Sequence, residues 1–477
     1  MPINPEFLVS KQRQVYTVTA ISTMMRNAIV SRVPSRAASP DGLHARRVKG
    51  FQMADAGVGY FESWKAVDGR LHIRNVDISE VAKSFGTPLY VYDAEAIRLS
   101  HQALAKSLDE FTIAYSVKAN PSVGICKLLQ SLGCWAEVAS GGEMLIARTA
   151  GFPEAHTMFA GPAKEESELR EACDKKIGIL KAESLRELEL LTSCMSRGTL
   201  RPSICIRVNT AESVSTAREI MAGGPSRFGL DEELLPSVLR QYGSKLNIVG
   251  LHVYSGSQIL NPREIIGNFA HIFDIFVACR QIVGEQFSTV VFGGGFGVPS
   301  GLCEPPLNLK ETVEGINRII RTSDIGDRLH FILELGRFLV ASSGIFITRV
   351  VDVKESRGVN FVLTDGGINN YLRPALKKLT HSVDLIERLN EAKRFSANVG
   401  GPLCTPLDEY ARAIELPKVR PGDLVGVFNA GAYGYSMSMH EFLGHRSPAE
   451  VIVDNGNVKE LRSRGTFSDL LAGQSWR

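Results

Sequence analysis

The sequence lacks closely paired cysteines. Eight cysteines are spread along 477 residues, and no two of them have C-x-x-C spacing. This absence excludes a zinc ribbon and a redox dithiol, and it argues against a dense disulfide framework. We therefore expect no metal site, a reducing compartment, and free thiols that mostly act as packing residues.

Long apolar runs and a strong charge of one sign are also lacking. No uninterrupted apolar run reaches the length of about eighteen residues that a membrane-spanning helix needs. The formal net charge is +3, and no basic block typical of nucleic-acid binding lies beyond the amino terminus. With 44% hydrophobic and 22% charged residues, the composition indicates a soluble globular protein with room for two cores. We expect a small-molecule partner, and neither nucleic acid nor membrane.

The first fifty residues have few acidic side chains and no clear hydrophobic period. Glu6 and Asp41 are the only acidic residues among them, against eight lysines and arginines. Such a segment is compatible with a transit peptide, a disordered leader or an upstream start, since Met25 and Met53 are alternative starts. We exclude residues 1–55 from the predicted fold, expect a cytoplasmic protein and leave organellar targeting open.

From Pro88 onward, segments typical of β-strands alternate with segments of helical apolar spacing. This alternation implies parallel pairing, and eight such units predict a (β/α)8 barrel. Barrel enzymes place their chemistry at the carboxyl ends of the strands, and polar or glycine-rich residues follow most of the predicted strands. These strands are 111–117, 134–139, 156–160, 177–182, 203–208, 248–254, 288–292 and 330–335.

The pattern of predicted secondary structure changes after about residue 340. Short β-rich runs are broken by turn residues, without regular helical segments between them. We predict a mostly antiparallel β domain over residues 339–477 and a barrel over residues 86–338. Residues 56–85 also have the pattern of strands, and we expect them to pair with the C-terminal β domain.

Lys118 follows the first predicted barrel strand and opens the tripeptide Lys118-Ala-Asn120. An amine attacks a carbonyl only in its neutral form, and burial among apolar neighbours lowers the pKa of a lysine. Lys118 is thus a candidate for aldehyde chemistry. Taken alone, it is also compatible with a surface lysine that closes a strand.

The run Gly293-Gly-Gly-Phe-Gly297 directly follows a predicted strand. Glycines allow a close backbone approach, and successive N–H groups form an anion-binding concavity, so the run suits a phosphate. Its spacing is not that of a Rossmann fingerprint, and phosphate sites of barrels commonly follow the late strands. A tight barrel loop without a ligand is the alternative.

Two further motifs follow late strands. Glu334 and Arg337 are three positions apart; a carboxylate of this kind can keep a pyridine nitrogen protonated, and an arginine suits a phosphate or carboxylate. A salt bridge at the barrel rim is the other interpretation. The imidazole of His252 is either a packed core side chain or a flat partner for a cofactor ring.

Together these motifs resemble the fold-type III pyridoxal-phosphate decarboxylases, in particular the diaminopimelate decarboxylases, with ornithine and arginine decarboxylases more distant. The resemblance covers roughly residues 60 to 465 and includes Gly401-Pro-Leu-Cys404 and Asn429-Ala-Gly-Ala-Tyr433. It implies an alanine-racemase-like barrel with a C-terminal β domain, pyridoxal 5'-phosphate as cofactor, and a homodimer with shared active sites.

The resemblance also implies roles for single residues. Lys118 resembles the lysine that forms the internal Schiff base, and Cys404 resembles the cysteine that crosses the dimer interface to protonate the carbanion. Cofactor contacts are implied for Arg207, His252, Ser257, Gly293, Gly294, Gly295, Glu334, Arg337 and Tyr433. Substrate contacts are implied for Arg337, Arg373, Lys377, Thr405 and Tyr433.

Departures from the diaminopimelate pattern bear on the substrate. Thr405 stands where that subfamily has an acidic residue, and Lys377 stands where it has a tyrosine. Arg373 and Lys377 without an acidic residue at 405 favour a substrate with an anionic or neutral distal end. We expect a natural-product branch, with a carrier-protein-tethered glutamyl group as one such substrate; meso-diaminopimelate is the alternative.

Two other classes of function share parts of this pattern. An amino-acid racemase shares the barrel and the lysine but normally reprotonates from a tyrosine, so Cys404 argues against it. A non-catalytic pyridoxal-phosphate-binding regulator is expected to lose Lys118 or the glycine run, and both are present.

Overall fold

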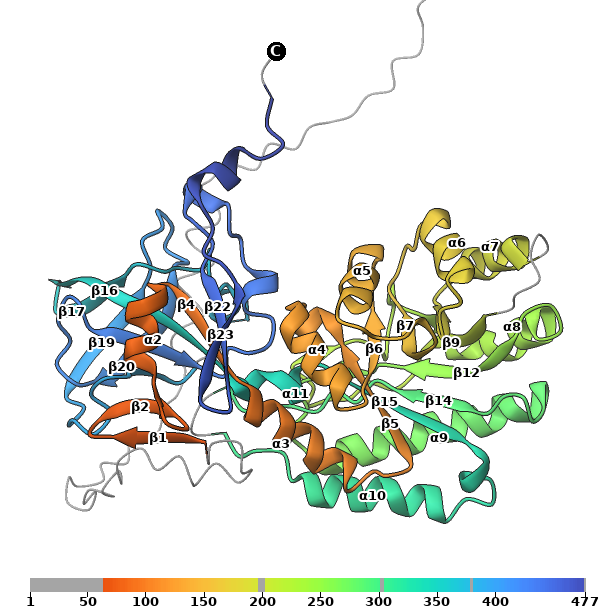
Figure 1. The fold of residues 1–477 in the computed structure, drawn as a ribbon. Coiled ribbons are helices and arrows are strands. Elements are labelled where there is room, and N and C mark those ends of the chain that lie inside the picture. Colours follow the sequence, from red (N-terminus) through yellow and green to blue (C-terminus); the bar gives the residue numbers. More distant parts are fainter. Residues whose placement is uncertain (1–62, 196–201, 301–303, 378–380, 476–477) are drawn as a thin grey trace, which may run out of the picture. The chain divides into compact units, whose positions relative to one another are not determined.

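A computed structural model describes residues 63–195, 202–300, 304–377 and 381–475 of the chain (Figure 1). The expected leader, residues 1–55, lies outside the described residues. Within them the chain forms a parallel barrel followed by a mostly antiparallel β domain, as predicted.

The barrel has eight parallel strands, and each coincides with a predicted one. They pair in the order β5-β6-β7-β8-β9-β12-β14-β15, and β15 pairs with β5 to close the barrel. The strands are β5 (Phe111–Ser116), β6 (Trp135–Val138), β7 (Thr157–Phe159), β8 (Ile179–Ala182), β9 (Ser203–Asn209), β12 (Ile248–Val253), β14 (Thr289–Phe292) and β15 (His330–Leu335).

Helices connect the barrel strands. The longest, α9, is apolar enough to pass for a membrane span by length and composition, but its buried face includes Phe269, Phe273 and Phe276, and Phe269 and Phe273 pack against Phe331 of the barrel. Helix α10 packs beside it (Figure 1). The connecting helices are α3 (Ala94–Ala105), α4 (Val123–Ser131), α5 (Gly141–Thr149), α6 (Glu166–Asp174), α7 (Leu185–Met195), α8 (Leu235–Tyr242), α9 (Pro262–Val283), α10 (Leu309–Arg321) and α11 (Arg337–Val340).

The barrel interior has an apolar layer with a polar layer above it. Successive residues of a strand point to opposite faces, so residues two apart share the interior face. The apolar layer is a buried cluster that includes Ala114, Ile179, Cys205, Val291 and Ile332. Two positions further along their strands stand Ser116, Lys181, Arg207, Gly293 and Glu334. The strand period therefore gathers polar groups at the carboxyl end of the barrel.

The β domain is built around the long strand β16, which pairs with β4, β17 and β21. Its sheet has the order β20-β19-β17-β16-β4-β22-β23, with β21 beside β16 and β18 beside β21. Helix α12 (Arg373–Lys377) lies between two of the strands in sequence. The strands are β4 (Leu89–Asp93), β16 (Gly344–Ser356), β17 (Val359–Thr364), β18 (Val383–Leu385), β19 (Phe395–Gly400), β20 (Glu409–Leu416), β21 (Leu424–Phe428), β22 (Ala449–Asp454) and β23 (Asn457–Arg462).

The segment before the barrel differs from our expectation. Strands β1 (Trp64–Val67), β2 (Arg70–Ile73) and β3 (Val76–Asp77) form a sheet of their own, followed by α2 (Ile78–Phe85). They pack against the β domain through a shared apolar cluster. The strand that joins the C-terminal sheet is β4, which we expected in the barrel segment. Because β4 is buried along its whole length, its apolar pattern does not reveal which sheet it joins.

Backbone contacts join the β domain to the turn that carries Lys118. The N–H of Tyr433 donates to the carbonyl of Ala119 over 2.7 Å, and Asn120 Nδ2 donates to the carbonyl of Gly431 over 3.0 Å. The loop after β21 is therefore bound to the carboxyl end of the barrel, at the two residues that follow Lys118.

Candidate active site

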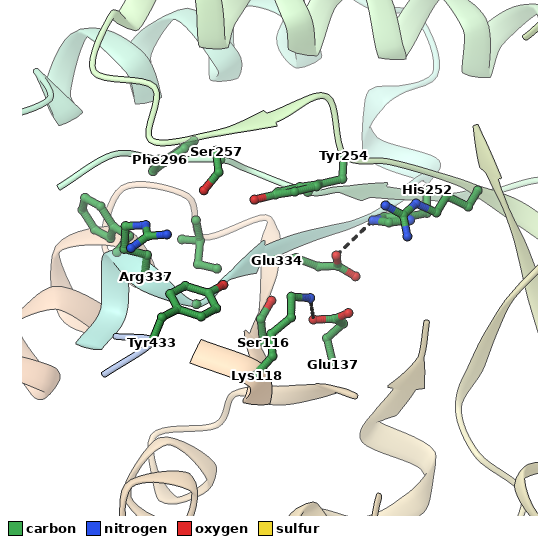
Figure 2. Close-up of a pocket in the computed structure, with 16 residues that line it drawn as sticks. Ser116, Lys118, Glu137, His252, Tyr254, Ser257, Phe296, Glu334, Arg337 and Tyr433 are labelled. Carbon is green, nitrogen blue, oxygen red and sulfur yellow. Dashed lines mark hydrogen bonds and ion pairs between the residues drawn. The ribbon is translucent and has the colours of Figure 1, made fainter. Parts of the chain in front are cut away.

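A pocket opens at the carboxyl end of the barrel (Figure 2). Most of the predicted cofactor residues line it, and Lys118 points into it in Figure 2. The lining residues are Ser116, Lys118, Glu137, Arg207, His252, Tyr254, Ser257, Gly293, Gly295, Phe296, Glu334, Leu335, Gly336, Arg337, Phe338 and Tyr433.

Lys118 forms an ion pair with Glu137, whose Oε2 lies 2.6 Å from Nζ (Figure 2). Our expectation that burial lowers the pKa of Lys118 is wrong. Burial is the largest single effect and acts in that direction, but the charge of Glu137, its hydrogen bond and the charges of Tyr433 and Tyr254 together raise the pKa above its usual value. The side chain is 42% exposed toward the pocket, so burial costs it less than a fully enclosed lysine. In the free protein Lys118 is an ammonium, and it must lose a proton before it can attack an aldehyde.

The contribution of this ion pair to the stability of the fold depends on pH. Burial disfavours the charged form of Glu137, yet Lys118 lowers the pKa of Glu137 to about 2. A lowered carboxyl pKa stabilises the fold above the unfolded value of about 4.3, and a raised lysine pKa stabilises it below about 10.4. The stability that this pair contributes is therefore constant between these limits, and it is lost toward strong acid and strong base.

Replacing Glu137 by glutamine removes the charge that keeps Lys118 protonated. We expect the apoprotein to capture pyridoxal phosphate at least about ten times faster at pH 7, because a pKa lower by one unit gives tenfold more neutral amine. The rise of the rate with pH should also move to lower pH. Stopped-flow absorbance measures both. Glu187→Gln is the control, since it breaks another buried pair, 3.0 Å from Lys164, away from the pocket. An unchanged pH dependence would mean that Glu137 only orients the lysine.

In Figure 2 Glu334 lies between His252 and the pair of Lys118 and Glu137, and it is almost fully buried. Its carboxylate pairs with the ammonium of Lys181, a residue of β8 that is 0% exposed. His252 Nε2 lies 3.0 Å from Glu334 Oε2, but the ring is out of line for a hydrogen bond, and both ring nitrogens are without one. Burial, followed by the charge of Lys181, holds the pKa of His252 well below its usual value, so the imidazole is neutral.

The glycine run after β14 is tightly packed, as a close backbone approach requires. Gly294 and Gly295 have positive φ of 68° and 75°. A Cβ on Gly294 would lie 2.7 Å from the Glu334 carbonyl oxygen, and one on Gly295 would lie 2.3 Å from that of Gly256. Gly293 and Gly295 line the pocket beside Ser257. Larger residues do not fit this loop, whether or not an anion binds there.

Cationic side chains surround the ring of Tyr433. The guanidinium of Arg337 lies 4.7 Å from the ring centroid, and that of Arg373 lies 5.3 Å from it. Lys377 follows one helical turn after Arg373. We call Arg337, Arg373 and Lys377 the basic cluster. Only Arg337 of the three lines the pocket.

Five predicted site residues lie outside the pocket lining: Arg373 and Lys377 of the basic cluster, Gly294, Cys404 and Thr405. Gly294 is part of the loop but contributes no lining surface, and Cys404 is exposed. Cys404 and Thr405 belong to the loop between β19 and β20, and neither lines the pocket of their own chain. Arg207 does line the pocket, where its Nη1 donates to both oxygens of Glu183 over 3.0 and 2.9 Å.

The sequence motifs did not identify Glu137, Lys181 and Tyr254 as site residues. Each is a polar residue in or directly after a predicted strand, at a position that the strand period turns to the barrel interior. That signal was available in the sequence. The pairing of each lysine with its carboxylate was not, because strand period gives the face of a residue and not its partner across the barrel.

The residues present fit pyridoxal phosphate. An amine, a carboxylate and a flat neutral imidazole face one pocket, with backbone N–H groups and Ser257 at its side. The buried nitrogens of His252 and Nε of Arg337 have no hydrogen-bond partner among the described residues. Buried polar atoms without partners are rare and call for an explanation such as an absent ligand.

Comparisons with known proteins agree with this site. Residues 94–341 match the family model of the pyridoxal-dependent decarboxylases, pyridoxal binding domain. An L-glutamyl-[BtrI acyl-carrier protein] decarboxylase of Niallia circulans is 32% identical over 416 residues, which cover 85% of this chain and 97% of the relative. A diaminopimelate decarboxylase of Aquifex aeolicus is 33% identical over 407 residues, with 84% and 94% covered.

Solved structures agree as well. The crystal structure of diaminopimelate decarboxylase from M. jannaschii superposes with a TM-score of 0.83 at 28% identity, and the match covers 88% of this chain and 99% of that one. Barrel, β domain and lysine pocket are thus those of one family. The chain belongs to the pyridoxal-phosphate-dependent decarboxylases.

Proposed function

We propose that this decarboxylase acts on an amino acid whose distal end carries no positive charge, such as a glutamyl group tethered to a carrier protein. The observation that carries the proposal is the basic cluster beside Tyr433. Relatives alone do not decide the substrate, because the glutamyl-carrier decarboxylase and the diaminopimelate decarboxylase are similar to this chain to nearly the same degree.

The three cations of the basic cluster outnumber the carboxylates that pair with them. Glu219 Oε1 lies 3.6 Å from Arg373 Nη2 and 3.4 Å from Lys377 Nζ, and among the described residues it is the one carboxylate that pairs with either. Arg337 forms no ion pair with a described residue. Burial, followed by the charge of Arg337, lowers the pKa of Arg373. A distal ammonium would add a further cation here, whereas a carboxylate, amide or thioester would not.

Within the described loop of residues 401–408, no free carboxylate replaces the one missing at Thr405. The next carboxylate in the loop is Asp408, which is buried. Its two oxygens accept from the backbone N–H groups of Ile368 and Leu403, both over 2.7 Å. Asp408 therefore fixes the shape of the Cys404 loop and offers no charge to a ligand.

When bound, the cofactor supplies an electron sink for the pair of electrons left at Cα as carbon dioxide departs. We infer that the amine of Lys118 holds its aldehyde, that Glu334 keeps its ring nitrogen protonated, and that the neutral ring of His252 lies on its face. Gly293, Gly294, Gly295 and Ser257 would hold the phosphate, with Tyr433, Arg337 and Arg207 nearby. Cys404 of the partner subunit would return a proton to Cα, which makes the homodimer the active form.

A substrate panel tests the proposal. Carbon dioxide release is measured with meso-diaminopimelate, lysine, ornithine, arginine, glutamate and carrier-tethered glutamate. We expect turnover of the glutamyl substrates and at least about tenfold less of the cationic ones, because an unfavourable contact with a distal charge costs roughly 1.4 kcal/mol or more. Strong turnover of meso-diaminopimelate, with none of the glutamyl substrates, would make this chain a diaminopimelate decarboxylase.

The variant Thr405→Glu, combined with Lys377→Tyr, sharpens this test. It adds the missing carboxylate and removes a cation, so we expect the preference to move toward meso-diaminopimelate. Leu407→Glu is the matched control, because Leu407 is an exposed residue of the same loop. A gain in Leu407→Glu as large as that in the double variant would show that any added negative charge suffices.

A further inference from the structure

We propose that Lys181 is a positioning residue for Glu334: its ammonium pairs with that carboxylate in the cofactor-free protein and gives up one proton when a protonated pyridine ring takes its place. The inference rests on the placement of Glu334 proposed above and not on the choice of substrate. It concerns a buried lysine for which the decarboxylation chemistry itself has no task.

The geometry of Lys181 leaves it a single close partner. Lys181 is on β8 with its side chain fully enclosed in the barrel, and its ammonium contacts Oε1 of Glu334 directly. The nearest alternative carboxylate, Glu137, is already paired with Lys118. The ionisable groups around Lys181 are Glu334, Glu137, Lys118, Arg207, Cys205 and His252.

Charge balance then restricts the loaded site. A buried cation is tolerated only with a partner, and one carboxylate cannot fully compensate two cations in a dry interior. If Lys181 stays protonated, a protonated ring nitrogen beside Glu334 makes two cations for one carboxylate. Burial lowers the pKa of Lys181 to about 7; the charge of Glu137 opposes this shift, and the charges of Lys118 and Arg207 add to it, so the proton of Lys181 is the one that can leave.

Lys181 Nζ and the ring nitrogen therefore share a single proton. In the free protein the proton is on Lys181 Nζ, where it offsets Glu334. In the loaded protein it is on the ring nitrogen, either carried in by the cofactor or passed from Lys181. In either case, the wild-type protein takes up one proton fewer on loading than a protein that lacks Lys181 and has Glu334 ionised before loading.

Calorimetric titration of apoprotein with pyridoxal 5'-phosphate, in two buffers of different ionisation enthalpy, measures the protons exchanged on binding. At pH 6 we expect the wild type to release about one proton more than Lys181→Met, and at pH 8.5 we expect the difference to vanish. Protons exchanged by the phosphate, the aldehyde and Lys118 are common to both proteins and cancel.

Three further variants separate this role from a structural one. Lys181→Gln replaces Lys181→Met if the latter does not fold, and it should give the same proton difference. Lys181→Arg keeps a cation that does not deprotonate, so it should bind the cofactor at least about tenfold more weakly at both pH values. Lys164→Met removes another buried paired lysine and should exchange protons as the wild type does.

The outcomes distinguish the role of Lys181 from the placement of Glu334 on which that role rests. Equal proton exchange in wild type and Lys181→Met at pH 6 overturns the role of Lys181. Glu334→Gln should weaken cofactor binding at least about tenfold, because a charged partner of the ring is lost. If Glu334→Gln binds pyridoxal phosphate as tightly as the wild type, the placement of Glu334 beside the ring is itself wrong.

Discussion

Lys118→Ala is expected to abolish decarboxylation and the visible absorbance of the bound cofactor. The variant has no amine at the pocket wall to hold the aldehyde, and the neighbouring Lys181 is enclosed and paired with Glu334. Loss of a covalent catalytic group commonly costs roughly 10⁴-fold or more. Carbon dioxide release and an absorbance spectrum after addition of pyridoxal phosphate measure the two effects.

The control for this experiment is Lys127→Ala. Lys127 is an exposed lysine of α4, nine positions along the chain from Lys118. We expect this variant to keep both the absorbance band and the activity. A visible band in Lys118→Ala equal to that of the wild type would assign the aldehyde to another lysine.

Two inactive variants are expected to restore activity when they are mixed. Cys404→Ala should lose about 10²- to 10⁴-fold, the range for a missing proton donor, although Cys404 lies outside the pocket of its own chain. If Cys404 completes the site of a second copy, then a mixed dimer of one Lys118→Ala subunit and one Cys404→Ala subunit has one intact site. A 1:1 mixture should recover about a quarter of wild-type activity, because half of the dimers are mixed and each has one working site of two.

The mixing experiment needs proof that the subunits exchange. Native mass spectrometry with one tagged variant counts the mixed dimers directly. Mixed dimers without recovered activity would exclude a shared site. A protein that stays monomeric at working concentration, yet decarboxylates its substrate, would exclude it as well.

Much of the barrel is predictable from the sequence, because each strand carries its own signal. A β-rich run ends in a polar or glycine-rich turn, and the barrel rule places all such turns at one end. This is why Lys118, His252, Gly293 and Glu334 are found at one pocket from motifs alone.

Other features depend on contacts between distant segments. The raised pKa of Lys118 comes from Glu137, which is on the next barrel strand, and no local pattern reveals that contact. The sheet that β4 joins is set by pairing with β16 and β22, more than 200 residues away in sequence. Family resemblance points to Cys404 and Thr405, whose roles stay predictions, but the inward turn of Asp408 is a property of the folded loop.

The backbone link between Tyr433 and Ala119 has a consequence for how such enzymes diverge. Lys118, which we propose to hold the cofactor, is on the barrel, whereas Arg373, Lys377, Thr405 and Tyr433 are on the β domain that is bound to the barrel beside it. Mutations in the loops of the β domain can therefore change which substrate is accepted while the barrel keeps its chemistry. One catalytic module is thus available to many pathways. The barrel cannot form the whole site alone, since a chain that ended at residue 341 would lack the part of the pocket wall that the β domain supplies.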